Sequence, residues 1–102
     1  MIYVFEVDGI GEYKIKISTG FMALTKKRVG LCHACVIRRM SDDLHVASVE
    51  EVGENETGFE TGWEERLLDN CLVKMFSGDK EGKEKARAKI MNWLAETRKE
   101  KQ

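Results

Sequence analysis

The feature that most constrains the fold of this 102-residue chain is a sequence pattern that recurs 42 residues downstream. Residues 7–12 (VDGIGE) followed by residues 19–21 (TGF) return as residues 49–54 (VEEVGE) followed by residues 61–63 (TGW). At the same offset, residues of similar type also align, for example Val4 with Val46 and Ile17 with Phe59. Because recurrence at one fixed offset is typical of a duplicated structural unit, the sequence predicts two tandem units of similar fold.

The start of the first unit has the pattern of a β-hairpin. Residues 2–7 are rich in β-branched and aromatic side chains, and residues 13–18 alternate apolar with polar side chains. Gly9 and Gly11 between them suit the turn, because glycine adopts positive φ without steric cost. The alternation predicts that the core-facing side chains are those of Tyr13, Ile15 and Ile17.

A helix is predicted to complete each unit. Thr19 is a suitable N-cap, and apolar residues then recur at helical spacing, which predicts a helix over residues 21–40 that is bent or broken at Gly30. In the second unit, residues 44–49 form a fair strand candidate and residues 55–60 a weak one. A capping box of Thr61 and Glu64 then predicts a second helix. The apolar face of that helix consists of Trp63, Leu67, Leu68, Cys71, Leu72, Met75 and Phe76.

The predicted fold is a single α+β domain over residues 1–102. It consists of two tandem ββα-type repeat units, residues 1–43 and 44–79, related by a pseudo-two-fold axis, and a C-terminal helix over residues 80–99. That last helix lies outside the repeat. Its predicted buried face consists of Ala86, Ile90, Trp93, Leu94 and Thr97. A hydrophobic content of 42% is enough for a core without compulsory disulfides or metal.

Composition bears on the compartment of the protein. The longest apolar runs are only a few residues, whereas a membrane-spanning helix needs about 20. The N-terminus also lacks the basic-then-apolar pattern of a signal peptide. Three cysteines are an odd number for a disulfide framework. We therefore expect a cytoplasmic protein with free thiols and no contact with a membrane.

The sequence CHAC, from Cys32 to Cys35, has the spacing of redox pairs and of half a zinc site. Cys71 and His45 are conceivable completing ligands. However, a second close pair of ligands is missing from the sequence, and the motif falls inside the predicted helix over residues 21–40. We therefore interpret the three cysteines as core residues and predict no bound metal and no cofactor.

Charge is unevenly distributed along the chain, although the net charge is only −1. The bases of the first 40 residues can form a phosphate-binding patch, but the acidic middle of so small a domain argues against nucleic acid as a partner. The acidic residues themselves can form a solvated face or contact a basic partner. The bases are Lys14, Lys16, Lys26, Lys27, Arg28, Arg38 and Arg39, and the acids are Glu50, Glu51, Glu54, Glu56, Glu60, Glu64 and Glu65.

Several residues are similar in layout to the GIY-YIG nucleases. They are Ile2-Tyr3 at the first strand, residues 13–18 (YKIKIS) in the second, Arg28 on the next helix and Glu64 or Glu65 on a later one. The resemblance implies a metal-dependent nuclease in which such residues take the tyrosine, arginine and metal-binding glutamate roles. The chain departs from the family at Lys16, where a near-obligatory glycine is expected, and in its longer interval from Ser18 to Arg28.

The paired motifs, the length and the scarcity of Asn and Gln resemble small proteins from filamentous viruses of hyperthermophilic archaea. This resemblance implies two like motifs and no enzymatic function, with the cytoplasm of the host cell as the compartment.

The predicted function is that of a protein-interaction module without enzymatic activity. Two like units side by side leave a groove at their junction, and a protein or peptide partner can enter it as an added strand or as a helix. Association into a homodimer stays open, and a degenerate nuclease is the alternative. The predicted partner-binding residues are the equivalent pairs Ile17 and Phe59, and Phe21 and Trp63.

Overall fold

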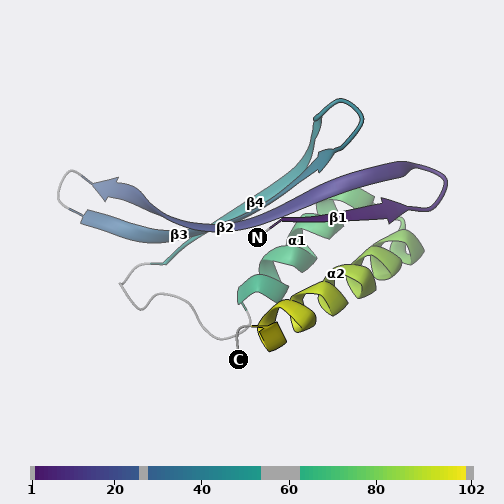
Figure 1. Ribbon diagram of the computed structural model, residues 1–102. Helices are drawn as coiled ribbons and strands as arrows, with labels where there is room; N and C mark the ends of the chain where they lie inside the picture. Colours follow the sequence, from purple (N-terminus) through teal and green to yellow (C-terminus); the bar gives the residue numbers. More distant parts are fainter. Residues whose placement is uncertain (1, 26–27, 54–62, 101–102) are drawn as a thin grey trace.

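The computed structural model describes residues 2–25, 28–53 and 63–100. Within these residues the chain forms four strands followed by two helices, and the strands make one antiparallel sheet in the order β1-β2-β3-β4. Both helices lie on the same side of the sheet (Figure 1). The predicted α+β class is therefore confirmed. The elements are β1 (Ile2–Val7), β2 (Gly11–Thr25), β3 (Arg28–Arg39), β4 (His45–Gly53), α1 (Trp63–Phe76) and α2 (Lys80–Glu100).

The first hairpin agrees with the sequence pattern. β1 pairs with β2 from Ile2 opposite Lys16 to Val7 opposite Gly11. The turn places Gly9 at φ 76° and Gly11 at φ 134°, which are backbone conformations that favour glycine. The predicted core-facing side chains of β2 are all buried, namely Tyr13, Ile15 and Ile17.

The predicted helix over residues 21–40 is wrong, because this segment belongs to two paired strands. The pairing of β2 with β3 runs from Tyr13 opposite Arg39 to Thr25 opposite Arg28. Over residues 32–39 of β3 the buried side chains are His33, Cys35 and Ile37, and the residues between them are more exposed. This period of two is that of a strand with one face in the core, and the long-range pairing outweighs the local helical spacing.

Because residues 21–39 belong to strands and not to a helix, the observed order of elements differs from the predicted ββα units. In the described part of residues 1–43 the chain forms three strands, so the ββα interpretation of this unit is wrong. Residues 44–79 contribute β4 and α1. The tandem repeat and its pseudo-two-fold axis are not confirmed. The weak strand at residues 55–60 and the capping residue Thr61 lie outside the described residues.

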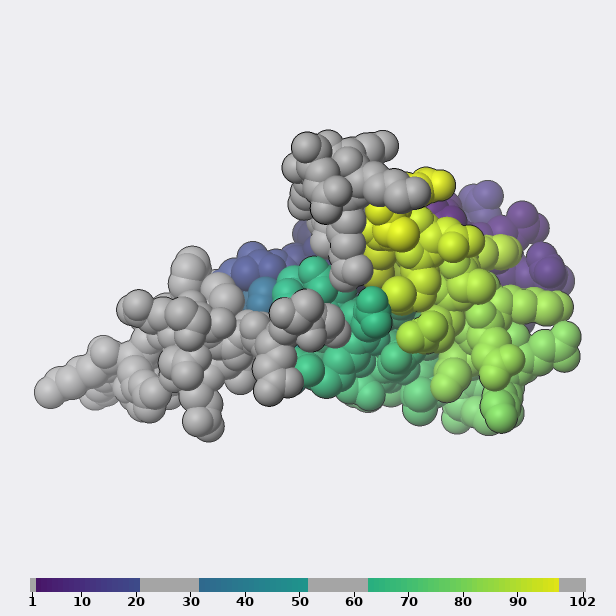
Figure 2. Space-filling view, turned by 90° about the horizontal axis from the view of Figure 1, so that it is seen from below, coloured from purple at the N-terminus to yellow at the C-terminus, as the bar shows by residue number. Residues whose placement is uncertain are grey.

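The core lies between the inner face of the sheet and the two helices. Each helix places a row of apolar side chains against the sheet, and Trp93 of α2 stacks on Tyr3 of β1 with ring centroids 5.1 Å apart. Seen from below, α1 and α2 cover much of the described sheet, with β1 visible beyond α2 (Figure 2). α2 agrees with the helix predicted over residues 80–99. The buried helical residues are Leu67, Leu68, Cys71, Leu72, Phe76, Ala86, Ile90 and Leu94.

Neither α1 nor α2 has a stretch that is both apolar and long enough to span a bilayer, and this finding applies to the described residues.

Candidate functional site

The second half of β2 has a strand neighbour on one side only. β1 pairs with β2 no further than Lys16, whereas the pairing of β2 with β3 continues to Thr25. In the described part of the chain, residues 18–25 therefore have a ladder with β3 and none on the side of β1. β2 and β3 extend together beyond the end of β1 (Figure 1). We call residues 18–25 of β2 the open edge.

One hydrogen bond fixes which backbone groups face the open edge. Met40 N donates to Glu12 O at 3.0 Å, so Glu12 directs its backbone groups toward β3. Hydrogen-bonding direction alternates along an antiparallel strand, and the register is unbroken as far as Ala23. The odd-numbered residues therefore direct N–H and C=O groups away from β3. At the open edge these residues are Thr19, Phe21 and Ala23.

The open edge lacks the side chains that commonly protect a sheet edge. Its sequence, STGFMALT, contains neither a charged residue nor a proline. Charged side chains and proline are common devices that prevent an edge strand from pairing with another chain. The only irregularity of register lies at its tip, between Ala23 and Thr25. This edge is therefore suited to accept another strand.

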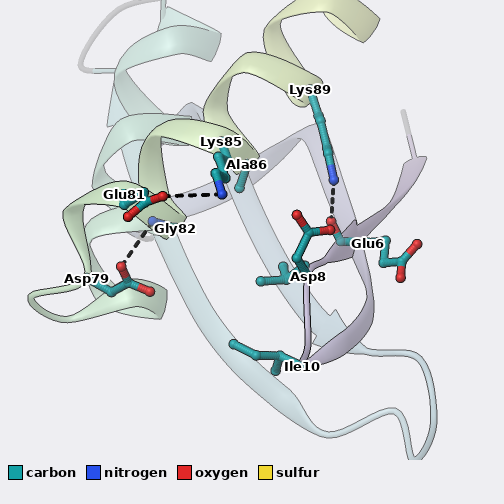
Figure 3. Close-up of a pocket in the computed structure, with 10 residues that line it drawn as sticks. Glu6, Asp8, Ile10, Asp79, Glu81, Gly82, Lys85, Ala86 and Lys89 are labelled. Atoms are coloured by element: carbon teal, nitrogen blue, oxygen red, sulfur yellow. Dashed lines mark hydrogen bonds and ion pairs between the residues drawn. The ribbon is translucent and has the colours of Figure 1, made fainter.

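The two outer edges of the sheet, those of β1 and β4, differ from the open edge. At each of them a lysine from a helix donates a hydrogen bond to a backbone carbonyl. On β1, Lys89 of α2 donates from Nζ to the carbonyl oxygen of Glu6 at 2.7 Å (Figure 3). On β4, Lys74 of α1 donates from Nζ to the carbonyl oxygen of Ser48 at 3.1 Å. These lysines occupy edge carbonyls with which an added strand would pair.

A rigid cluster lies beside the start of the open edge. Thr19 Oγ1 and His33 Nδ1 are hydrogen-bonded at 2.9 Å, and the two residues are paired across β2 and β3. Trp63, the first residue of α1, stacks on the His33 ring with centroids 3.5 Å apart. His33 is only 4% exposed. α1 therefore fixes the sheet at the point where the open edge begins.

Charged groups surround this histidine. Burial lowers the pKa of His33, while the carboxylates of Glu64 and Glu51 act in the opposite direction. Glu51 pairs with His33 across β3 and β4, and its Oε2 lies 2.9 Å from Nη2 of Arg66 on α1. The ion pair is a second tie between α1 and the sheet.

The predicted partner-binding residues differ in their surroundings. Ile17 is only 2% exposed and belongs to the core, whereas Trp63 is half-buried against His33. Phe21 contributes backbone to the open edge, and Phe59 lies outside the described residues. Ile17 and Phe21 flank Thr19 along β2, and Trp63 contacts the partner of Thr19. Three of the four positions therefore lie around one residue pair, although the groove itself stays a prediction.

The cysteines do not form the local pair that their spacing indicates. Residues three apart in a strand point to opposite faces, so Cys35 is buried in the core while Cys32 belongs to the outer face. Cys71 Sγ donates to the Cys35 carbonyl oxygen at 3.7 Å. A separate side-chain hydrogen bond with Cys71, together with burial, raises the pKa of the Cys35 thiol. All three thiols are free. Cys35 and Cys71 are core residues as predicted, although Cys35 lies on a strand and not on a helix. The prediction is wrong for Cys32, which is outside the core because the strand period places it on the other face.

A small cavity lies between the β1–β2 turn and the start of α2, with a volume of about 170 Å³. Its polar groups are largely engaged with one another. Asp79 Oδ1 accepts a hydrogen bond from Gly82 N at 3.0 Å, and Lys85 Nζ lies 3.3 Å from Glu81 Oε1 (Figure 3). Within the described residues, no cluster of His, Cys, Asp and Glu is arranged to hold a metal ion. We assign this cavity to the docking of α2.

The residues of the nuclease resemblance are spread over the fold. Arg28 begins β3 and does not lie on a helix, and Glu64 and Glu65 lie in the first turn of α1. Tyr3 stacks on Trp93, a contact that belongs to the core. No family model, curated protein or solved structure matches the chain. Both family resemblances stay predictions.

Proposed function

We propose that the protein is an interaction module that binds an extended segment of a partner protein as an additional strand along the open edge. The observation that carries this proposal is that residues 18–25 are paired with β3 alone and contain no charged residue. Strand addition uses main-chain hydrogen bonds for affinity and alternate side chains for specificity. The incoming segment would continue the line of β1 next to β2.

Two further observations support this location. One outward carbonyl of β1 and one of β4 already accept hydrogen bonds from Lys89 and Lys74, so these edges are poorer acceptors of a strand. The open edge also begins next to the stacked His33 and Trp63, which limits the motion of its base. A preorganised edge loses less conformational entropy on binding than a mobile one.

The composition of the open edge indicates the chemistry of the partner. Because residues 18–25 are uncharged, a charged side chain on the incoming strand would find no ion-pair partner there. We expect a segment of about six residues, rich in β-branched and apolar side chains and free of proline. A second copy of this chain is the other occupant to test, since two open edges can pair antiparallel about a two-fold axis.

Selection from a displayed random-peptide library against the full chain, followed by hydrogen exchange of the complex, tests the proposal. A bound strand should protect the amides of Thr19, Phe21 and Ala23. The amides of Gly20 and Met22 already face β3, so their protection should change little. A selected peptide that leaves the three odd-numbered amides unprotected would contradict strand addition.

The substitution Ala23→Pro provides a second test, because proline removes an N–H at the open edge. We expect at least tenfold weaker peptide binding, and the matched control Ala23→Val, which keeps the N–H, should bind the peptide with an affinity within about twofold of that of the unsubstituted protein.

Sedimentation of the protein without peptide tests whether a second copy of the chain occupies the open edge. A concentration-dependent dimer that Ala23→Pro abolishes would assign the edge to self-association.

A further inference from the structure

A basic hollow of about 460 Å³ is lined by side chains of the sheet. It lies on the face opposite the core, because Tyr13, Ile15 and Ile17 face the core and the lining residues of β2 alternate with them. It shares Ser18 with the open edge but differs from it in function, because side chains line the hollow and no main-chain pairing is involved. The lining combines three bases, one acid, one hydroxyl and two aliphatic side chains: Lys14, Lys16, Arg38, Asp43, Ser18, Ile2 and Val36.

Strand register brings the three bases together. Lys14 of β2 lies directly opposite Arg38 of β3, and Lys16 lies between Ile2 of β1 and Val36 of β3. Like charges directly opposite each other destabilise an antiparallel pair. The arrangement of Lys14 and Arg38 is therefore unfavourable unless negative charge lies nearby.

The charges of the hollow are only partly compensated. Lys14 Nζ lies 3.6 Å from Asp43 Oδ1. Arg38 Nη1 donates to the carbonyl oxygen of Asp43 at 3.1 Å, and that acceptor is uncharged. Lys16 has no ion pair with any carboxylate in the described part of the chain. Three positive charges and one negative charge leave a net charge of +2 in the hollow.

We propose that this hollow binds a small phosphate monoester. A phosphate monoester carries a charge near −2 at neutral pH and three strong acceptor oxygens, which matches the net charge and the number of cationic side chains. The Arg38 guanidinium offers a planar pair of donors, while Lys16 acts as a point charge. Ser18 adds a hydroxyl donor. The exposed Ile2 and the aliphatic Val36 would contact the esterified group.

The size of the hollow agrees with this class of ligand. Small-molecule sites commonly enclose about 300–1,000 Å³, and a nucleoside monophosphate fits that range. A carboxylate brings one charge and two oxygens, so it would leave part of the positive charge unpaired. No cofactor was predicted from the sequence, but the three bases are among those that can form a phosphate-binding patch. The pairing of residues 28–39 with β2 brings Lys14, Lys16 and Arg38 together.

Calorimetric titration of the full chain with adenosine 5′-monophosphate at low salt tests the proposal, with adenosine as the uncharged comparison. We expect saturable binding at one site, with adenosine at least tenfold weaker. Added salt should weaken the monophosphate complex, because the charges are partly exposed. Equal affinity for adenosine and its monophosphate would overturn the assignment.

Substitutions locate the site. Lys16→Gln and Arg38→Gln should each weaken binding at least tenfold, and Arg38→Lys should restore only part of it. Asp43→Asn should strengthen binding about threefold because it removes the negative charge, and asparagine tolerates the positive φ of 57° at this position. The matched control is Lys80→Gln, an exposed lysine at the start of α2, which should change affinity less than twofold.

Two comparisons complete the test. Amide NMR spectra of each variant establish that it is folded, and unchanged affinity in folded Lys16→Gln would overturn the proposal. A 5′-phosphorylated single-stranded oligonucleotide that binds when the monophosphate does not would reassign the hollow to a nucleic-acid end. Ala23→Pro should leave monophosphate affinity unchanged, and a loss there would refute a site separate from the open edge.

Discussion

The two halves of β2 differ in what surrounds them, although they are parts of one continuous strand. Residues 13–16 have β1 on one side and β3 on the other, and the inward side chains of Tyr13 and Ile15 pack in the core with residues of both helices. Residues 18–25 keep the pairing with β3 and have no strand on the other side in the described part of the chain. The first half therefore packs in the core, whereas the second half has backbone groups with which no described strand pairs.

The difference shows that one strand can serve two purposes when its neighbours end at different places. The ladder with β3 keeps the second half extended, and the core beneath the first half anchors the whole strand. A strand held in this way has already lost most of its conformational freedom, so a partner has less to order. The experiments below test whether stability and recognition divide between the two halves.

The largest expected effect lies in the first half. Ile15 has no exposed surface and packs in the core, so Ile15→Ala should lower the free energy of unfolding by about 2–5 kcal/mol. Urea denaturation followed by circular dichroism measures this loss. Ser18→Ala in the second half is the comparison and should change stability by less than about 0.5 kcal/mol. Equal losses at the two positions would show that the halves do not differ in their contribution to the core.

Proline substitutions test the two sides of the second half. Met22 faces β3 with its N–H and pairs with Gly30, so Met22→Pro should remove a ladder hydrogen bond and destabilise the protein by about 1–3 kcal/mol. Ala23→Pro removes an N–H at the open edge and should have a smaller effect. Urea midpoints of the two variants give the comparison. The reverse order would mean that β2 presents its even-numbered residues to the open side.

Much of the first hairpin and of both helices was predictable from local patterns. Residues 2–7 and 13–18 have the composition and alternation of strands, and the apolar stripes of α1 and α2 have helical spacing. These signals lie within a few residues of one another, so a sequence window contains them. The turn glycines supply a third local signal, and the structure places them at positive φ.

The segment over residues 21–40 was not predictable in the same way. Its apolar residues fit a helical period, but pairing with a strand on each side decides the conformation of β3. Period two at His33, Cys35 and Ile37 was a usable signal, which the helical interpretation obscured. The open edge and the contact between Thr19 and His33 follow from that pairing, so neither was visible before the register was known. A phosphate-binding patch of the bases was predicted, but the pairing of β2 with β3 is what selects Lys14, Lys16 and Arg38 from them.

Removal of the lysine caps tests why the outer edges differ from the open edge. Lys74→Ala and Lys89→Ala each delete one exposed hydrogen bond and should lower stability by about 0.5–1 kcal/mol. The double variant should also self-associate more readily, because the edges of β4 and β1 lose a protecting charge. Sedimentation velocity measures association, and Lys→Arg variants that keep a donor are the controls. A double variant that stays monomeric at high concentration would mean that the caps do not protect these edges.

The smallest expected effect is a pH dependence at the junction of the two halves, where His33 contacts Thr19. Burial lowers the pKa of His33 in the folded protein, although Glu64 and Glu51 favour its charged form, and Trp63 covers the ring. The unfolded chain then binds a proton more readily than the folded chain. Stability should therefore be fully present above about pH 6.5 and fall as pH decreases below it.

Urea denaturation between about pH 7.5 and 5.5 measures the slope of the free energy of unfolding against pH. This range lies above the one in which ordinary carboxylates titrate. His33→Gln should flatten it, since the amide can still bond to Thr19 but does not gain a charge in this range. The control is His45→Gln, an exposed histidine at the start of β4. A slope that survives in His33→Gln and disappears in His45→Gln would place the titrating group at the wrong end of the sheet. That outcome would contradict the assignment of the pH dependence to the buried ring of His33.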